Sequence, residues 1–219
     1  MTGVELLNWA RGPGLQIALV VFIVGVAIRF IEMWLLGKSP DFAEARGSAA
    51  AGGWRTLFTR SLPMPGALKR APLVFLGGYV FHIGFFITFL FYAPHILFLR
   101  AVTGFSWPAL PAYLIDVIGL VSIAALVAVL VHRLTDPVRR FLSRTGDYVA
   151  WAATFLPLLT GYFAYHRLVT DYTTMLALHV LSFELLLVLI PLTKLMHTFT
   201  FAVSRWYNGA IAGRKGVKV

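Results

Sequence analysis

The sequence contains no cysteine, and this absence limits the redox chemistry that the chain can carry. Iron–sulfur clusters are held by cysteine thiolates, and structural disulfides and catalytic thiols need the same residue. All three are therefore excluded for this chain by itself. A redox centre would have to use other side chains, and the six histidines are the obvious candidates.

Charged residues are also scarce. They make up 13% of the 219 residues, whereas hydrophobic residues make up 59%. Soluble domains are typically about 25% charged and about 45–50% apolar. So few charges cannot cover a water-facing surface, and the composition therefore predicts an integral membrane protein that uses lipid as its solvent.

Acidic residues are the rarer charged class. The chain has 9 Asp and Glu against 19 Lys and Arg, which gives a formal net charge of +10. In a soluble protein this excess would favour nucleic acid as a partner. In a membrane protein it is typical of basic loops on the cytoplasmic face, so no nucleic-acid partner is expected.

Five apolar segments are long enough to cross the hydrocarbon core of a bilayer, which takes about 20 mostly apolar residues. Backbone amides in lipid must be satisfied internally, so each segment is expected to be helical. The sequence therefore predicts an all-α, five-helix transmembrane bundle that forms a single domain over residues 1–219. The predicted spans are roughly 15–36, 71–98, 110–132, 149–166 and 175–203.

Basic residues are unevenly distributed between the two ends of these spans. Segments 38–70 and 133–148 and the C-terminal tail hold 14 Lys and Arg, against three in the connections on the opposite side. By the positive-inside rule, the N-terminus is expected outside and the C-terminus in the cytoplasm, in the inner (cytoplasmic) membrane. Segment 38–70 also carries Trp54 and Phe58, which is typical either of a docking surface or of a simple connector.

Four histidines lie at two depths in the second and fifth predicted spans. His179 and His197 are eighteen residues apart. In a continuous helix this is five turns, so both rings would lie on one face, roughly 27 Å apart. His82 is at the inner depth of His197, and His95 is at the outer depth of His179. Imidazole is a good axial ligand of haem iron, so the pattern predicts two bis-histidine haems stacked across the bilayer.

The fourth ligand is open at this point. His95 lies thirteen residues after His82, about 140° away around an ideal helix, so the two do not share a face. Pro94 would restore the phase by kinking the preceding turn. His166, at the outer end of the fourth span, is the rival partner of His179. For any single histidine at a span end, a structural role is the competing interpretation.

Three segments resemble the respiratory nitrate reductase gamma subunit family of di-haem cytochromes b. FHIGFF at 81–86 is similar to the first haem-ligand helix of that family, and LHVLSFELLLVLIPLTKLMH at 178–197 is similar to its last. AIRFIEMW at 27–34 is similar to the end of its first span, so the resemblance covers nearly the whole chain. Related membrane cytochromes serve sulfite reductase-linked and heterodisulfide reductase-like complexes. The family places its second histidine ten residues after the first, where this chain has Tyr92.

The resemblance implies an electron-transfer subunit with two b haems. Electrons from quinol in the membrane would pass through both haems to an iron–sulfur or catalytic partner subunit on the cytoplasmic side. His82 and His197 would hold the inner haem, and His95 and His179 the outer one. The same electron path run in reverse would reduce quinone. A haem-free transporter or membrane anchor is the alternative of a different class.

Four charged residues in or near the spans are further candidates for function. Arg29 and Lys194 would contact haem propionates, which need cationic partners at a site of low dielectric constant. Snorkelling to the inner interface is the alternative for both, and an ion pair with Glu32, one turn away, is a further alternative for Arg29. Glu184 would accept a proton during quinol oxidation, or be neutral and bonded to a neighbouring helix. Asp116, near the outer end of the third span, is a second candidate proton acceptor.

Overall fold

The computed structural model describes residues 1–37, 42–63 and 65–217, and the regular secondary structure of these residues is entirely helical. The all-α prediction is therefore confirmed. Lys38 and Lys218, two of the basic residues counted above, lie outside the described residues. The helices are α1 (Gly3–Trp9), the π-helical turn η1 (Ala10–Gly14), α2 (Leu15–Leu35), α3 (Ala49–Thr59), α4 (Pro65–Arg70), α5 (Pro72–Phe91), α6 (Ala93–Thr103), α7 (Ala112–Thr135), α8 (Pro137–Leu142), α9 (Thr145–His166), α10 (Tyr172–Leu192), the 3₁₀ turn η2 (Lys194–Met196) and α11 (His197–Arg214).

Four helices in the described part of the chain are long and apolar enough to cross a membrane. The chain is therefore a multi-pass membrane protein. The four helices overlap the predicted first, second, third and fifth spans, with different ends. The predicted fourth span is present as the 22-residue helix α9. This helix begins with a polar turn and is not one of the four. The apolar helices are Gly3–Leu35, Pro72–Phe91, Ala112–Thr135 and Tyr172–Leu192.

The second predicted span is two helices rather than one. α5 ends at Phe91, Tyr92 is extended (φ −79°, ψ 127°), and α6 begins at Ala93. Pro94 causes the break, because its ring cannot donate to a carbonyl one turn back and would collide with it. Trp107 Nε1 donates to the freed Leu90 carbonyl at 2.7 Å. The prediction of one helix over 71–98 is therefore wrong, although Pro94 was correctly identified as the disturbing residue.

The fifth predicted span is also interrupted. α10 ends at Leu192, directly after Pro191, and Thr193 is extended (φ −129°, ψ −177°). The Thr193 hydroxyl accepts a hydrogen bond from Leu195 N at 3.2 Å, which starts the 3₁₀ turn, and α11 begins at His197. The prediction that one continuous helix carries His179 and His197 on a single face is therefore wrong.

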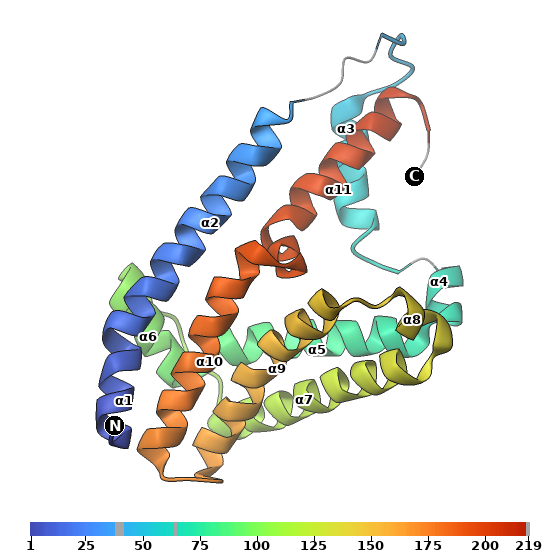
Figure 1. Ribbon diagram of the computed structural model, residues 1–219. Helices are drawn as coiled ribbons and strands as arrows, with labels where there is room; N and C mark the ends of the chain where they lie inside the picture. Colours follow the sequence, from blue (N-terminus) through green and yellow to red (C-terminus); the bar gives the residue numbers. More distant parts are fainter. Residues whose placement is uncertain (38–41, 64, 218–219) are drawn as a thin grey trace.

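Small residues bring the first span close to α10, and Figure 1 shows α2 and α10 side by side. A Cβ atom on Gly25 would lie 2.7 Å from the Pro191 ring, and one on Gly14 would lie 2.9 Å from Glu184 Oε2. Ala18, between the two glycines, is buried. Lipid provides no hydrophobic driving force for helix association, so close packing of this kind holds spans together.

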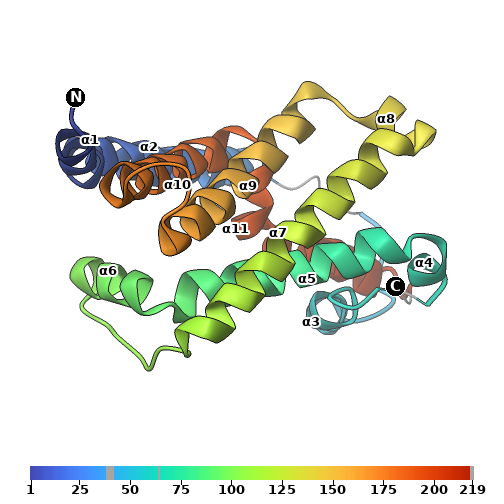
Figure 2. The same ribbon diagram turned by 90° about the horizontal axis from the view of Figure 1, so that it is seen from below.

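The remaining spans form a second close contact. α5 packs against α7, where a Cβ on Gly77 would lie 2.8 Å from Val129 and one on Gly84 would overlap Ser122. α9 contacts both α7 and α10, and Figure 2 shows it between them. α9 therefore joins the pair α5–α7 to the pair α2–α10.

α3 and α11 form a separate helical pair at one end of the molecule (Figure 1). Their axes approach closely because glycines face each other. A Cβ on Gly209 would lie 2.5 Å from the Gly52 carbonyl oxygen, and one on Gly213 would lie 2.5 Å from the Ser48 carbonyl oxygen. Part of the segment predicted to be a connector or a docking surface is thus an ordered helix packed on the C-terminal helix.

Candidate functional site

Two pairs of histidine rings face each other in the structure. The ring centroids of His82 (α5) and His197 (the start of α11) are 6.1 Å apart, with an angle of 77° between the ring planes. Those of His95 (α6) and His179 (α10) are 6.0 Å apart, with an angle of 22°. The structure therefore brings together the same four histidines, in the same pairs, that the sequence singled out.

These separations suit two rings that share one metal ion. A metal–imidazole bond is about 2.0–2.1 Å long, so two coordinating nitrogens on opposite sides of a metal are about 4 Å apart. Adding the distance from each nitrogen to its ring centre gives centroids about 6 Å apart.

All four rings make a hydrogen bond through Nδ1. A carbonyl oxygen can only accept, so in three rings Nδ1 carries the proton, which leaves Nε2 with a lone pair. Metal-bound histidines usually donate their second N–H in this way, which fixes the tautomer and the ring orientation. The Nδ1 partners are Gly78 O for His82 (2.6 Å), Lys194 O for His197 (2.8 Å), Thr88 O for His95 (3.1 Å) and Thr160 Oγ1 for His179 (3.3 Å).

The break at Tyr92 explains why His95 faces His179. An unbroken helix would turn His95 away from the face that carries His82. Instead the chain restarts as α6, and the His95 ring lies between the rings of Phe89 (5.9 Å) and Tyr92 (5.2 Å). This geometry favours His95 over His166 as the partner of His179.

A glycine of α9 makes room for the His179 ring where α9 packs on α10. A Cβ on Gly161 of α9 would lie 3.0 Å from His179 Cε1 and 3.2 Å from Nδ1. The residue directly before it on α9, Thr160, holds the same ring by its hydroxyl. Neither residue was predicted from the sequence, because nothing in their spacing shows that α9 packs on α10 at this point.

The outer pair, His95 and His179, lines a cavity of about 830 Å³ between the two groups of spans. That volume lies within the range of about 300–1,000 Å³ that is typical of cofactor and ligand sites. Phe89 and Phe183 stack at 5.7 Å and form part of the apolar wall. The cavity therefore combines apolar rings with two histidines, as a site for a flat, mostly apolar group requires.

Polar groups gather elsewhere on the wall of the same cavity. They include Arg11, Asp116 and Arg167. Arg167 also lies over the Tyr172 ring, at 5.8 Å. His166 is bonded through Nε2 to Asp116 Oδ1 at 2.8 Å, and the structure does not bring it to His179.

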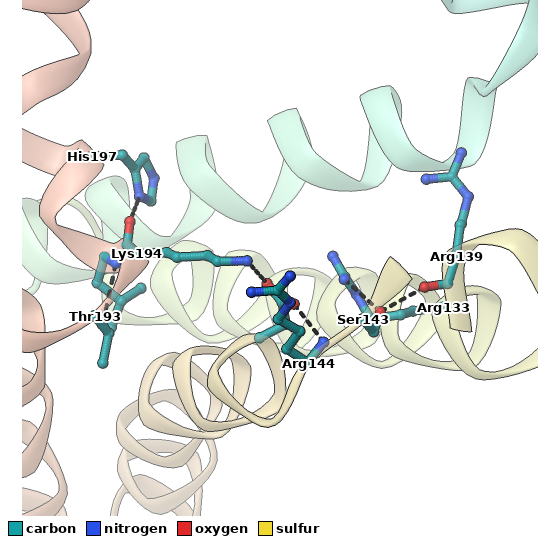
Figure 3. A network of polar contacts seen from close by, with 9 residues as sticks. Arg133, Arg139, Ser143, Arg144, Thr193, Lys194 and His197 are labelled. Atoms are coloured by element: carbon teal, nitrogen blue, oxygen red, sulfur yellow. Dashed lines mark hydrogen bonds and ion pairs between the residues drawn. The ribbon is translucent and has the colours of Figure 1, made fainter. Parts of the chain in front are cut away.

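His197, one of the pair His82 and His197 that we call the inner pair, lies beside a network of polar contacts that includes Lys194 and Arg144 (Figure 3). Lys194 Nζ donates to Asp147 Oδ1 at 2.6 Å, and Arg144 N donates to Asp147 Oδ2 at 2.9 Å. The Lys194 hydrogen bond, assisted by that of the Arg144 backbone, lowers the pKa of Asp147 below its usual value. Because the Lys194 carbonyl also holds His197, this ion pair anchors the turn that carries the inner histidine.

Arg29, like Lys194, has a carboxylate partner in the structure. Arg29 donates through Nη1 to Glu32 at 2.8 Å and through Nε to the Pro191 carbonyl oxygen at 2.9 Å. Arg29 thus covers a carbonyl at the α10 break. A contact of Arg29 or Lys194 with haem propionates stays a prediction.

Glu184 is buried at the contact between α10 and η1, beside Gly14. Within the described residues, its Oε1 atom has no hydrogen-bond partner. Its role as a proton acceptor stays a prediction. Among the described residues, no group of three or more His, Cys, Asp or Glu side chains is arranged to hold a metal ion, whereas a bis-histidine haem needs only two.

Comparison with known proteins adds a relationship but no activity. A protein of Nitratidesulfovibrio vulgaris with the name "Protein" is 32% identical over 207 residues, which cover 90% of this chain and 89% of the relative. No protein-family model and no solved structure matches the chain. With this identity over nearly the full length of both, the chain belongs to the same protein family as the N. vulgaris protein.

Proposed function

We propose that this protein is a membrane cytochrome b subunit that carries two b haems and passes electrons through the bilayer. One observation carries the proposal: two separate pairs of histidine rings face each other, and in each pair the ring centroids are about 6 Å apart. The resemblance of 81–86 and 178–197 to the nitrate reductase gamma subunit family supports the same assignment of ligands.

The residues present fit two haems. His95 and His179 would hold the outer haem in the cavity, and His82 and His197 would hold the inner one. Haem iron, when bound, supplies one-electron chemistry that the polypeptide lacks. The backbone carbonyls that accept from Nδ1 keep the rings oriented and make Nε2 a better ligand. The apolar wall around Phe89 excludes water from the outer site.

Cationic residues would neutralise the haem propionates. We propose Lys194 and Arg29 for the inner haem, as their places near the inner end suggest. Arg11 and Arg167 line the outer cavity and are placed for the outer haem. A guanidinium can form two parallel hydrogen bonds with a carboxylate, which suits this role.

We propose five spans, with residues 149–166 of α9 as the fourth. The whole of α9, 22 residues, is about 33 Å long and residues 149–166 of it about 27 Å, close to a hydrocarbon core of about 30 Å. Two of its threonine hydroxyls are bonded to backbone carbonyls, as suits a lipid environment: Thr154 Oγ1 donates to Trp151 O at 2.9 Å and Thr160 Oγ1 to Leu156 O at 2.7 Å. An odd number of spans puts the two termini on opposite sides of the membrane. The excess of Lys and Arg in 38–70, 133–148 and the tail favours an outside N-terminus and a cytoplasmic C-terminus, in the inner membrane.

The proposed path runs from quinol in the membrane to the outer haem, then to the inner haem and to an iron–sulfur or catalytic partner subunit on the cytoplasmic side. The basic residues at the end of the molecule that carries α3 and α11 support the cytoplasmic side as the docking face. There α3 presents Trp54 and Phe58 with exposed side chains. Aromatic and basic residues together are typical of protein interfaces.

A visible spectrum tests the proposal. The chain is purified in detergent, its haem is quantified per polypeptide, and its reduced-minus-oxidised difference spectrum is recorded. Two b haems per chain are expected. One haem would remove one of the two sites, and no haem in a folded sample would contradict the proposal and leave a transporter or membrane anchor. Reduction by a dehydrogenase partner rather than by quinol would reverse the direction of flow.

A further inference from the structure

Asp116 and His166 form a hydrogen-bonded pair at the cavity that contains the outer histidines. Asp116, on α7, lines the cavity, and His166 is the last residue of α9. Their side chains are 28% and 33% exposed, so the pair connects the cavity with the surface. His166 is bonded to Asp116 and contacts the rings of Tyr162 and Tyr165 rather than those of His95 and His179, so the pair is separate from the proposed haem ligands.

A row of aromatic rings runs from this pair to the outer histidines. The His166 ring lies 4.9 Å from the Tyr165 ring, and the Tyr165 ring lies 6.2 Å from that of Tyr92. Tyr92 in turn lies 5.2 Å from His95. A flat molecule bound between the row and the cavity wall would touch Asp116 while it remained close to His95.

A carboxylate bonded to an imidazole is a good proton acceptor. When Asp116 accepts from Nε2–H, the neutral ring presents Nδ1 as a base, and an added proton forms an imidazolium that the carboxylate stabilises. A positioned base of this kind is suited to general-base catalysis. An ion pair that only stabilised the protein surface would not need to lie at a cavity, and its histidine would not need to be neutral.

We propose that the Asp116–His166 pair accepts the phenolic protons of a hydroquinone bound in the outer cavity. This inference rests on the proposed function and names the residues that handle the protons. The apolar rings of the wall suit a quinol ring, and Asp116 provides a hydrogen-bond acceptor for a phenolic hydroxyl. The exposed side of His166 provides the exit to solvent.

A hydroquinone loses two electrons and two protons, both O–H bonds break, and a quinone is formed. The oxidant would be the haem that His95 and His179 would hold in the proposed function, which would supply one-electron chemistry and so take up the two electrons one at a time. The first proton moves to the Asp116–His166 pair and leaves to solvent through His166, and the second follows by the same route.

Other ionisable groups face this site from every neighbouring element. Arginine is always protonated and tyrosine ordinarily titrates near pH 10, so neither changes its charge near neutral pH. The two outer histidines are occupied as ligands in the proposed function. The Asp116–His166 pair is therefore the group that we expect to set the pH dependence of hydroquinone oxidation. The facing groups are Arg11 from η1, Tyr92 from the end of α5, Tyr162 and Tyr165 from α9, Arg167 from its C-terminal cap, and Tyr172 from α10.

The test uses the purified full-length protein with its haems and the variants Asp116→Asn and His166→Gln. Menadiol is the quinol probe, and dithionite is a reductant that needs no quinol site. Both variants are expected to keep two haems and normal reduction by dithionite. Reduction by menadiol should be about 100-fold slower at pH 7, the effect of losing a general base. The double variant should be no slower than the slower single variant.

Two further readouts separate this role from a structural one. The menadiol rate of the wild-type protein should depend on pH through the Asp116–His166 pair, and this dependence should be absent in His166→Gln. The equilibrium dissociation constant of 2-heptyl-4-hydroxyquinoline N-oxide, measured by fluorescence quenching, should increase about tenfold in Asp116→Asn. Asp136→Asn, the same change at the inner end of α7, is the matched control and should behave as wild type.

Unchanged menadiol rates and pH profiles in both variants, with haems retained, would overturn the proposal. If Asp116→Asn fails to hold haem, the menadiol rate and pH profile of His166→Gln alone decide whether the proposal stands. A wild-type protein without haem would contradict the proposed function instead. In that case the binding of the quinoline N-oxide still tests the pair, because equal affinity in wild type and Asp116→Asn would overturn it.

Discussion

The outer and inner histidine pairs have almost the same ring separation but very different surroundings. His95 and His179 are half-buried in a cavity that four of the long helices and α6 enclose. Their rings are nearly parallel, at 22°. His82 and His197 are exposed, and their rings are nearly perpendicular, at 77°.

The difference indicates two kinds of site. The outer pair is enclosed by side chains from elements far apart in the sequence, so its geometry depends on how the helices pack. The inner pair is set by two local backbone features: the carbonyl one turn before His82 and the turn between α10 and α11. In the proposed function the enclosed site meets quinol, and the open site passes electrons to a partner.

Removal of single ligands should have the largest effect and should separate the two sites. His179→Ala and His95→Ala should each leave one haem per chain, the inner one, because a haem with one axial ligand is lost from this cavity. His82→Ala and His197→Ala should each leave only the outer haem. Haem is quantified per polypeptide and assigned by its difference spectrum.

His166→Ala is the matched control for these variants, since His166 is bonded to Asp116 and lies away from His179. It should keep both haems. Loss of the outer haem in His166→Ala, with retention in His95→Ala, would reverse the assignment of the fourth ligand.

Gly161→Val should affect only the enclosed site. The Cβ atom would lie 3.0 Å from the His179 ring, so the larger side chain must displace that ring. We expect loss of most of the outer haem with full retention of the inner one. Gly146→Val, in the same helix at a glycine with nothing within 4 Å, is the control. Equal loss of both haems in Gly161→Val would show general misfolding rather than a local effect.

Gly213→Leu should detach α3 from α11 and leave both histidine pairs in place. The leucine side chain would meet the Ser48 carbonyl and Gly52, where the helices approach most closely. Overpacking of this kind costs about 1–3 kcal/mol. We expect faster cleavage of segment 42–63 by added protease, with an unchanged haem content. Protection equal to wild type would contradict the packing of the pair.

Asp147→Asn should have the smallest effect and should act at the inner end. Lys194 lowers the pKa of Asp147 in the folded protein. The stabilisation by the ion pair is therefore present above about pH 4, the ordinary pKa of Asp, and is lost as pH falls through the lower folded-state pKa. At pH 7 the variant should be less stable by about 0.2–1 kcal/mol, as for exposed ion pairs.

Thermal unfolding in detergent at pH 7 and at pH 3 measures this difference. Asn should lower the midpoint at pH 7, and the gap between variant and wild type should narrow at pH 3. A gap that widens on acidification would contradict the assigned partner of Lys194.

The apolar segments predicted where the helices lie but not where they break. Mean hydropathy identifies 71–98 and 175–203 as continuous apolar segments. Each segment's helix break is at a single proline, Pro94 or Pro191, and one proline lowers the mean hydropathy too little to reveal it. The breaks depend on partners distant in sequence: Trp107 covers the carbonyl freed at Leu90, and Arg29 covers the one at Pro191. Such contacts cannot be read from a local pattern.

The pairing of the histidines was predictable, because the reason for it does not depend on continuous helices. Residues at equal depth in a membrane meet if their spans are neighbours, and depth follows from position in a span. The parts that were missed, such as Gly161 against His179 and Gly25 against Pro191, are small residues whose partners depend on which helices pack together. A glycine in a span indicates a close approach but does not name the neighbour.

Low-temperature electron paramagnetic resonance of the oxidised protein tests the central claim most directly. Two low-spin ferric haems with bis-imidazole ligation are expected, and the ring angles predict that they differ. The nearly parallel outer pair should give an ordinary rhombic signal that disappears in His179→Ala, and the nearly perpendicular inner pair a highly anisotropic signal that disappears in His82→Ala. A protein with no low-spin haem signal, or with signals that survive both substitutions, would contradict the account.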